Sequence, residues 1–449
     1  MRQRIILVAV SLLCVLSVSA QEVWTLERCM AYAVEHNHDV RRAELQADSY
    51  RASKLAAVGH FLPGVEANVG AQYNFGRAID PETNTYTHVN TFYNGYSVSL
   101  SMPIFDGFSR LHALRAAKAD VLMGRESLRC QQDETALATL QAYVDACYYE
   151  GMVRMAEEHR QECELLLRQT SLLVEVGRKS QADLAQIEAQ QAEADYEVTR
   201  QRNRHASALL ELSKQMGTPN LQLATSFPLE DYDLLSSTSL EPTPTAEGRT
   251  PAESGAEAGV QGGLLLQSYY AAQSARHEWD RARAGFYPSL SLGVGMNTTF
   301  YKTLHSHGSP SFSHQFRNNR GEYVAVSLSV PIFNRLQTLT SVRRAKNNYL
   351  MAQEAYEQKK LEVEKLCMEA CGDFDAYRMQ TVQMKKKVEA DSLAYQLTRR
   401  QYEEGLSTAI DLHTTSVQLS QSRATLLQCR LMVLVKHYLL RYYRGEQIW

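Results

Sequence analysis

The chain repeats one set of short motifs about 228 residues apart. The segment SLSMPIFD at 99–106 returns as SLSVPIFN at 327–334, and FLP at 61–63 returns as FYP at 286–288. Three further residues return at the 228-residue spacing: Gly177, Asp183 and Leu184 match Gly405, Asp411 and Leu412. Internal duplication indicates an architecture in which each half supplies equivalent parts to one larger object.

The first twenty residues are typical of a secretory signal peptide. Arg2 and Arg4 precede an apolar run, and Val18-Ser19-Ala20 places small residues at the cleavage position. The alternative, an uncleaved anchor helix, is disfavoured because the run is short for a membrane span. No later stretch approaches twenty apolar residues, so the sequence predicts no transmembrane helix in the mature chain. The formal net charge of −3 argues against nucleic acid as a partner.

Two short segments in each half alternate strictly between apolar and polar residues. The apolar positions of the four segments are Val65 to Phe75, Tyr96 to Ile104, Leu290 to Met296 with Phe300, and Val324 to Ile332, taking every second residue within each range. This pattern fits a soluble antiparallel sheet with one buried face, and it also fits a transmembrane β-barrel. Aromatic residues gather at the strand ends, where interfacial girdles belong, and the polar face is small and uncharged. Together with the secretion signal, these features favour the barrel.

The remaining sequence predicts long helices. Pro103 and Pro331 mark the strand-to-helix switches, where a missing backbone N–H is harmless. About 73 residues follow each proline with hardly any helix-breaking residue. Such a run is on the order of 110 Å of helix, which needs coiled-coil-like partners along its length. Residues 232–263 are rich in Ser, Thr, Pro, Glu and Gly and predict a flexible connector.

A matching turn follows each long helix, near 177–184 and 405–412. Gly177 and Gly405 predict left-handed helix stops, and Ser180 and Thr408 predict N-caps of the returning helices. Asp183 and Asp411 then have two interpretations. Each carboxylate stabilises its own helix N-terminus, or several copies converge on one axis and form an acidic ring that favours cations.

In this order and duplicated, these motifs make the chain resemble the TolC family of outer membrane efflux proteins. Leu26-Glu27-Arg28-Cys29, with Ala33 and Asn37, adds to the resemblance near the start. The resemblance implies a mixed α and β fold: a homotrimer with four strands per chain, a twelve-stranded transmembrane barrel, and a long α-helical barrel extending into the periplasm.

The family's function is implied with the fold. The resemblance predicts a passive exit duct of a tripartite efflux pump or type I secretion system, located in the outer membrane and contacting its lipid. The implied partners are a periplasmic adaptor and an inner membrane transporter. The exported cargo stays open, because such ducts lack a substrate pocket.

The family's closed gate implies tip residues at Asp183, Tyr402 and Asp411. An arginine and a second ring aspartate of the family's archetype fall at Ser407 and Thr414, where both are absent. The bonds that hold the gate closed are then weaker in this chain or use other groups, for which Arg178, Lys179 and Arg400 are candidates. His38 replaces the usual proline after Asn37.

The domain organisation follows from the repeat. We expect a signal peptide at 1–20, a first repeat at 21–231 with a β-hairpin at 61–105, the connector at 232–263, and a second repeat at 264–449 with a β-hairpin at 286–333.

Two rival functions remain. A periplasmic adaptor explains the helices and secretion but not four strands and two tips. An enzyme or metal protein would need a site, and His305, His307 and His314 lack a nearby carboxylate or cysteine. No nucleophile–base arrangement and no phosphate-cradling loop is found, so we expect no catalytic residues, cofactor or metal.

Overall fold

The computed structural model describes residues 24–80, 85–88, 90–218, 263–304, 311–443 and 445–449. The predicted signal peptide and residues 232–262 of the predicted connector lie outside the described residues, as do His305 and His307. The described chain divides into two compact units, each of which takes segments from both halves of the sequence. The tip unit comprises the described residues within Met1–Leu45, Glu126–Leu266 and Lys359–Trp449, and the sheet unit comprises Gln46–Arg125 and Gln267–Gln358.

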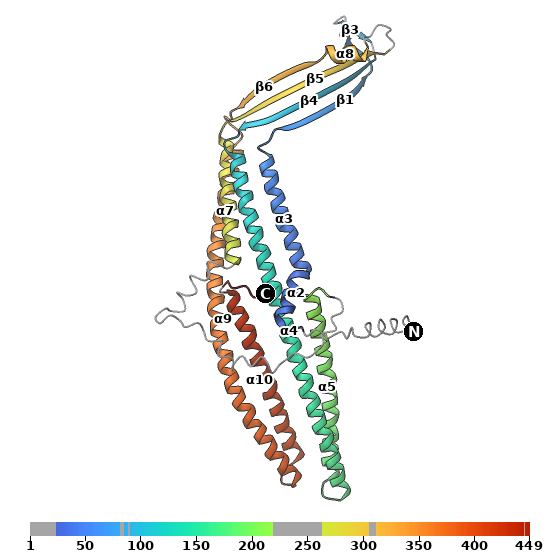
Figure 1. The fold of residues 1–449 in the computed structure, drawn as a ribbon, viewed down its shortest axis with the longest axis vertical. Helices are drawn as coiled ribbons and strands as arrows, with labels where there is room; N and C mark the ends of the chain where they lie inside the picture. The colour runs from blue at the N-terminus through green and yellow to red at the C-terminus, as the bar shows by residue number, and fades with distance from the viewer. Residues whose placement is uncertain (1–23, 81–84, 89, 219–262, 305–310, 444) are drawn as a thin grey trace, which may run out of the picture. The chain divides into compact units, whose positions relative to one another are not determined.

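The chain combines long helices with one four-stranded sheet (Figure 1). The helices are α2 (Leu26–His36), α3 (His38–Gly59), α4 (Ser109–Glu175), α5 (Gln181–Gln215), α7 (Gly263–Arg283), α8 (Phe312–Asn318), α9 (Gln337–Glu403) and α10 (Ala409–Tyr443), with a 3₁₀ turn η2 (Ala284–Phe286). The strands are β1 (Gly64–Asn74), β2 (Arg77–Asp80), β3 (Thr85–His88), β4 (Thr91–Phe105), β5 (Ser289–Thr303) and β6 (Gly321–Ser329). The predicted mixture of long helices and four strands is confirmed. Within the described residues, no helix has the length and apolar character needed to cross a membrane.

The sheet has the antiparallel order β1-β4-β5-β6. Its register aligns the alternating patterns of all four strands, because Val65 pairs with Leu100, Leu100 with Val294, and Val294 with Val324. Side chains in one such row point to the same face. The residues at the two ends of this row are exposed to solvent, Val65 by 68% and Val324 by 73%. The sheet unit therefore carries an apolar face that the described chain leaves uncovered.

The connecting segments between paired strands hold structure that alternation does not predict. In the segment of chain that connects β1 to β4, β2 and β3 form a small antiparallel pair. In the segment that connects β5 to β6, the chain forms α8. Gln315 of α8 bonds both backbone groups of Tyr301, through its Oε1 at 2.9 Å and its Nε2 at 2.8 Å. His314, one of the three histidines weighed as metal ligands, is an exposed residue of α8 whose ring bonds Asn318.

The long helices begin later than the sequence predicts. Pro103 lies inside β4, where the pairing with β5 is irregular between Pro103 and Phe105, and Pro331 lies two residues beyond β6. α4 and α9 begin six residues after each proline. The intervening turn needs left-handed backbone, supplied at Gly107 (φ 66°) and Phe108 (φ 69°) and again at Arg335 (φ 55°) and Leu336 (φ 64°). The prolines thus lie near the ends of the strands, and each pair of left-handed residues directly precedes a long helix.

The core of the tip unit lies where α2 packs against α4, α5 and α10. Cys29, Met30 and Ala33 of α2 are fully buried, as are Ala136 and Ala146 of α4. The cluster continues through a larger set of buried side chains: Leu140, Tyr143, Cys147, Leu212, Met216, Leu434, Tyr438 and Ile448. Burial raises the pKa of the Cys29 thiol to about 12, so this cysteine serves as a small apolar group.

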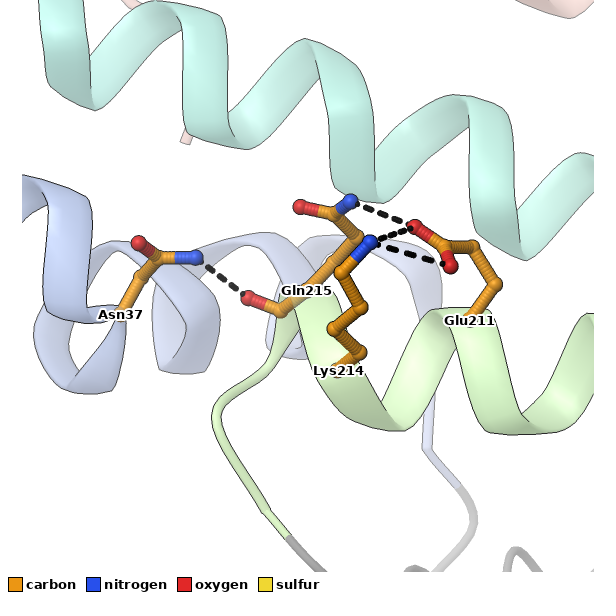
Figure 2. Close-up of polar contacts among 4 residues, drawn as sticks. All are labelled: Asn37, Glu211, Lys214 and Gln215. Atoms are coloured by element: carbon orange, nitrogen blue, oxygen red, sulfur yellow. Dashed lines mark hydrogen bonds and ion pairs between the residues drawn. The ribbon is translucent and has the colours of Figure 1, made fainter.

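Asn37 separates α2 from α3 and ties both to α5. Its Oδ1 accepts a 2.7 Å bond from the Asp39 amide at the start of α3, and its Nδ2 donates a 2.8 Å bond to the Gln215 carbonyl (Figure 2). The same figure shows the Glu211 carboxylate receiving bonds from the side chains of Lys214 and Gln215. His38 occupies the first position of α3 without disturbing this junction.

Candidate functional site

Each long helix ends in the same hydrogen-bonded stop. The amide of Gly177 (φ 75°) donates to the Val174 carbonyl at 2.9 Å, and the amide of Arg178 donates to the Leu173 carbonyl at 2.8 Å. The amides of Gly405 (φ 80°) and Leu406 repeat the pattern at 3.1 and 2.8 Å. These are Schellman motifs, whose left-handed residue suits glycine. Both long helices therefore end in a turn that is closed by a left-handed glycine.

Ser180 and Asp183 form a capping box at the start of α5. The Asp183 amide donates to Ser180 Oγ at 3.1 Å, while Asp183 Oδ2 accepts from the Ser180 amide at 3.2 Å and its hydroxyl at 2.8 Å. These bonds, and secondarily the charge of Lys179, lower the pKa of the Asp183 carboxyl from its usual 3.8. Asp183 is therefore ionised at neutral pH and stabilises the end of its own helix.

Thr408 and Asp411 reproduce this box at the start of α10. The Asp411 amide donates to Thr408 Oγ1 at 3.2 Å, and Asp411 Oδ2 accepts from the Thr408 amide at 3.1 Å and its hydroxyl at 2.6 Å. The Ser407 hydroxyl adds a 3.3 Å bond. Bonds from Thr408 and then Ser407 lower the pKa of Asp411. Ser407, where the family resemblance implies an arginine, therefore supports the local turn.

Tyr402 lies inside a small apolar cluster at the tips. The cluster joins α5, α9 and α10 through the buried side chains of Ile187, Tyr402, Ala409 and Leu412. Tyr402 is only 1% exposed, and its hydroxyl lies 3.3 Å from the fully buried hydroxyl of Thr170 on α4. Burial raises the pKa of Tyr402, with Thr170 opposing and the Asp183 charge adding to the shift. The Tyr402 phenol is therefore neutral at physiological pH.

Lys179 is the candidate cation that the structure places on Tyr402. Its Nζ lies 3.7 Å from the centroid of the tyrosine ring, within the range of a cation–π contact. Arg178 and Arg400 have exposed side chains. Thr414, at the position of the second ring aspartate, donates to the Ile410 carbonyl of its own helix. Lys179 thus links the first tip turn to α9.

The tips bring the predicted residues together only in part. Tyr402 and Lys179 are in contact, whereas each aspartate bonds the cap of its own helix. The sequence did not point to Thr170 or Gln190. The Thr170 hydroxyl contacts the Tyr402 hydroxyl, and the Gln190 side chain donates to the Ala409 carbonyl at 3.5 Å. No motif marks either residue, because a buried threonine or glutamine within a long polar helix has no distinctive spacing. At the described tips, no three metal-ligating side chains meet.

The family model for outer membrane efflux proteins matches this chain over residues 31–218 and 264–442. The match covers both halves of the sequence and omits the segment between them. It includes α3, the sheet, both tips and nearly all of α10.

Two curated relatives are secretion proteins. The alkaline protease secretion protein AprF of Pseudomonas aeruginosa is 28% identical over 61% of this chain and 54% of its own length. The proteases secretion protein PrtF of Dickeya chrysanthemi is 20% identical over 72% of this chain and 66% of its own length. The match to AprF thus spans about half of that relative.

Among solved structures, CusC has a similar fold. Its chain superposes with a TM-score of 0.80 over 94% of this chain and 92% of its own, at 17% sequence identity. At that identity the likeness establishes the fold of the chain, including the mixture of sheet and long helices.

Proposed function

Because this chain belongs to the outer membrane efflux protein family, we propose that it forms an outer membrane channel. The channel acts as the passive exit duct of a tripartite efflux pump or type I secretion system. Cargo crosses the periplasm and outer membrane through its pore. The family's role is transport and not catalysis.

The single observation that carries the membrane assignment is the uncovered apolar face of the sheet. Rows such as Val65, Leu100, Val294 and Val324 run across all four strands, and Val326 and Leu328 on the edge strand are 64% and 66% exposed. A soluble protein rarely exposes an apolar surface of this extent. Three copies that pair their edge strands would close a twelve-stranded barrel with this face toward outer membrane lipid.

The same threefold assembly gives the repeat a role. Two helical hairpins per chain would then build a helical barrel of six similar hairpins that extends into the periplasm. Asp183 and Asp411 would recur around its axis, and an acidic ring of this kind favours cations. Tyr402 and Lys179 would act as part of the gate by holding the turns against α9.

Exposed apolar residues at the tips support a periplasmic adaptor and an inner membrane transporter as partners. Val176, Leu406 and Ile410 are 75%, 76% and 61% exposed beside the two tip turns. Apolar side chains rimmed by polar ones are typical of protein interaction sites. The names of AprF and PrtF add secreted protein as a cargo class.

The test is purification of the mature protein from membranes, followed by measurement of mass and conductance. We expect it to extract with the outer membrane in detergent, to behave as a trimer, and to conduct ions in planar bilayers. A monomer that stays in solution without detergent contradicts the proposal.

A further inference from the structure

Three metal-ligand side chains meet on two helices of the sheet unit. His112 lies on α4, and His277 and Asp280 lie on α7. One ligand atom from each side chain lies within 4.8 Å of the other two. His277 and Asp280 are three residues apart and so share one face of α7, opposite the first turns of α4. Of the described residues, these are the three that meet in this way.

Each of the two imidazoles has a ring nitrogen without a hydrogen-bond partner. The Nδ1 atoms of His112 and His277 are buried, and neither has a hydrogen-bond partner in the described chain. A buried polar atom left unpaired costs free energy, so each such atom in a native protein requires an explanation. A bound cation supplies one, because neutral imidazole nitrogens are ligands for Zn²⁺ and related ions.

Asp280 supplies an oxygen donor close to His112. Its Oδ2 lies 4.0 Å from His112 Nδ1, while its Oδ1 lies 3.5 Å from an Arg283 nitrogen. Ligand atoms around tetrahedral zinc are about 3.3 Å apart, given Zn–N and Zn–O bonds near 2 Å. Side-chain rotations that move these atoms by about 1 Å would close the site. Arg283 keeps a second contact when displaced, since its guanidinium lies 5.7 Å from the centroid of the Trp279 ring.

The backbone already holds the two helices together beside this cluster. At Gly107, just before α4, an added Cβ would lie 2.7 Å from Tyr287 Cβ and 2.8 Å from the Ala284 carbonyl oxygen. Ala284 directly follows α7. An ion at the cluster therefore has to bring together side chains only, and not whole helices.

We propose that His112, His277 and Asp280 form a binding site for a divalent transition-metal ion of the zinc type, which links α4 to α7. Two imidazoles and one carboxylate fill three positions, and water fills the fourth. Imidazole ligands favour zinc and copper over calcium and magnesium, which prefer oxygen. The site is independent of the tips and of the channel proposal.

The test is titration of the full-length, detergent-purified and metal-stripped protein with Zn²⁺ in a calorimeter. We expect one ion per chain, and a thermal unfolding temperature that rises with Zn²⁺. His112→Gln and His277→Gln should each weaken binding at least about tenfold, which is the lower end of the typical loss when an outer-shell partner of a metal site is removed. The matched control is His38→Gln, which changes an exposed histidine of α3 and should bind Zn²⁺ as the parent does.

Two further measurements separate this site from other ligands. Arg283→Gln should tighten binding, because it removes the cation that pairs with Asp280. Substitution with Co²⁺ should give an absorption spectrum without a thiolate charge-transfer band, since no cysteine belongs to the site. Equal Zn²⁺ binding by the parent and both histidine variants, all correctly folded by circular dichroism, overturns the proposal, as does the absence of binding to the parent.

Discussion

The hydroxyl of Tyr402 lies 3.3 Å from the hydroxyl of Thr170, which joins α9 to α4 close to both tip turns. Both side chains are buried, so neither hydroxyl has water as a ready substitute. Such a pair holds two long helices in register with a single polar contact, and its loss leaves a buried polar group unsatisfied.

Tyr402→Phe should loosen the tips by about 1 kcal/mol, because the Thr170 hydroxyl loses its partner. In planar bilayers we expect a higher resting conductance. The matched variant Thr170→Val keeps the shape of the side chain, and the double variant should cost no more than the larger single change. Additive losses of stability, or an unchanged closed state in Tyr402→Phe, would exclude this pair as part of the gate.

Asp411→Asn removes a charge at the tip, whereas Thr408→Ala removes the cap and leaves the charge. If the carboxylate contributes to an acidic ring, Asp411→Asn should lower the cation preference measured from reversal potentials. Thr408→Ala should instead destabilise the start of α10 by about 1 kcal/mol with little effect on ion preference. Unaltered preference in Asp411→Asn would leave that carboxylate with its capping role alone.

The tips should lose protection from hydrogen exchange in acid. The folded-state pKa values of Asp183 and Asp411 lie below 3.8, so their stabilisation is complete above the ordinary pKa and disappears as pH falls through the lowered values. We expect the protection factors of residues 177–184 and 405–412, corrected for intrinsic exchange rates, to decrease when the pH is lowered below about 4. Asp183→Asn/Asp411→Asn should remove most of this pH dependence, and a response equal to the parent's would contradict the assignment.

Gly107→Ala should destabilise the sheet unit by about 1–3 kcal/mol, because the new Cβ meets backbone and Tyr287 in a left-handed conformation. Arg335, at the equivalent position of the second half, already has a side chain at φ 55° and is exposed. Arg335→Ala is therefore the matched control, with an expected change within about 0.5 kcal/mol. Urea unfolding curves measure both, and equal effects would refute the close approach.

Asn37→Ala should cost about 1–3 kcal/mol, because it leaves the Asp39 amide and the Gln215 carbonyl without their partner. Asn37→Ser keeps an oxygen that caps α3 but is too short to reach Gln215, so we expect about half of the loss to be recovered. Thermal unfolding of the two variants compares the bonds. No difference from the parent would show that water replaces both.

The repeat allowed much of the fold to be predicted from sequence. α4 and α9 end at Glu175 and Glu403, 228 positions apart, and α5 and α10 begin at Gln181 and Ala409 with the same separation. Their capping residues are short polar side chains and glycines, whose local chemistry needs no tertiary information.

The helix starts and the loop elements were not predictable in the same way. Arg335 and Leu336 adopt left-handed backbone although neither residue favours it, so only the tertiary structure specifies that turn. The side chains around Tyr402 belong to a contact between helices more than 200 residues apart, through Thr170 on α4. The His112, His277 and Asp280 cluster is likewise spread over two helices whose pairing no local pattern reveals.

α4 and α9 are each 67 residues long. One residue inserted into α4 alone would move its tip by about 1.5 Å and turn it by about 100° relative to α9. Thr170 would then face away from Tyr402, and Lys179 of the first tip turn would lose its contact with the Tyr402 ring. Substitutions along these helices are absorbed one side chain at a time, but a change in length is not. Natural variation in this family should therefore alter the two helices by matching whole turns, which makes length the most constrained property of the sequence.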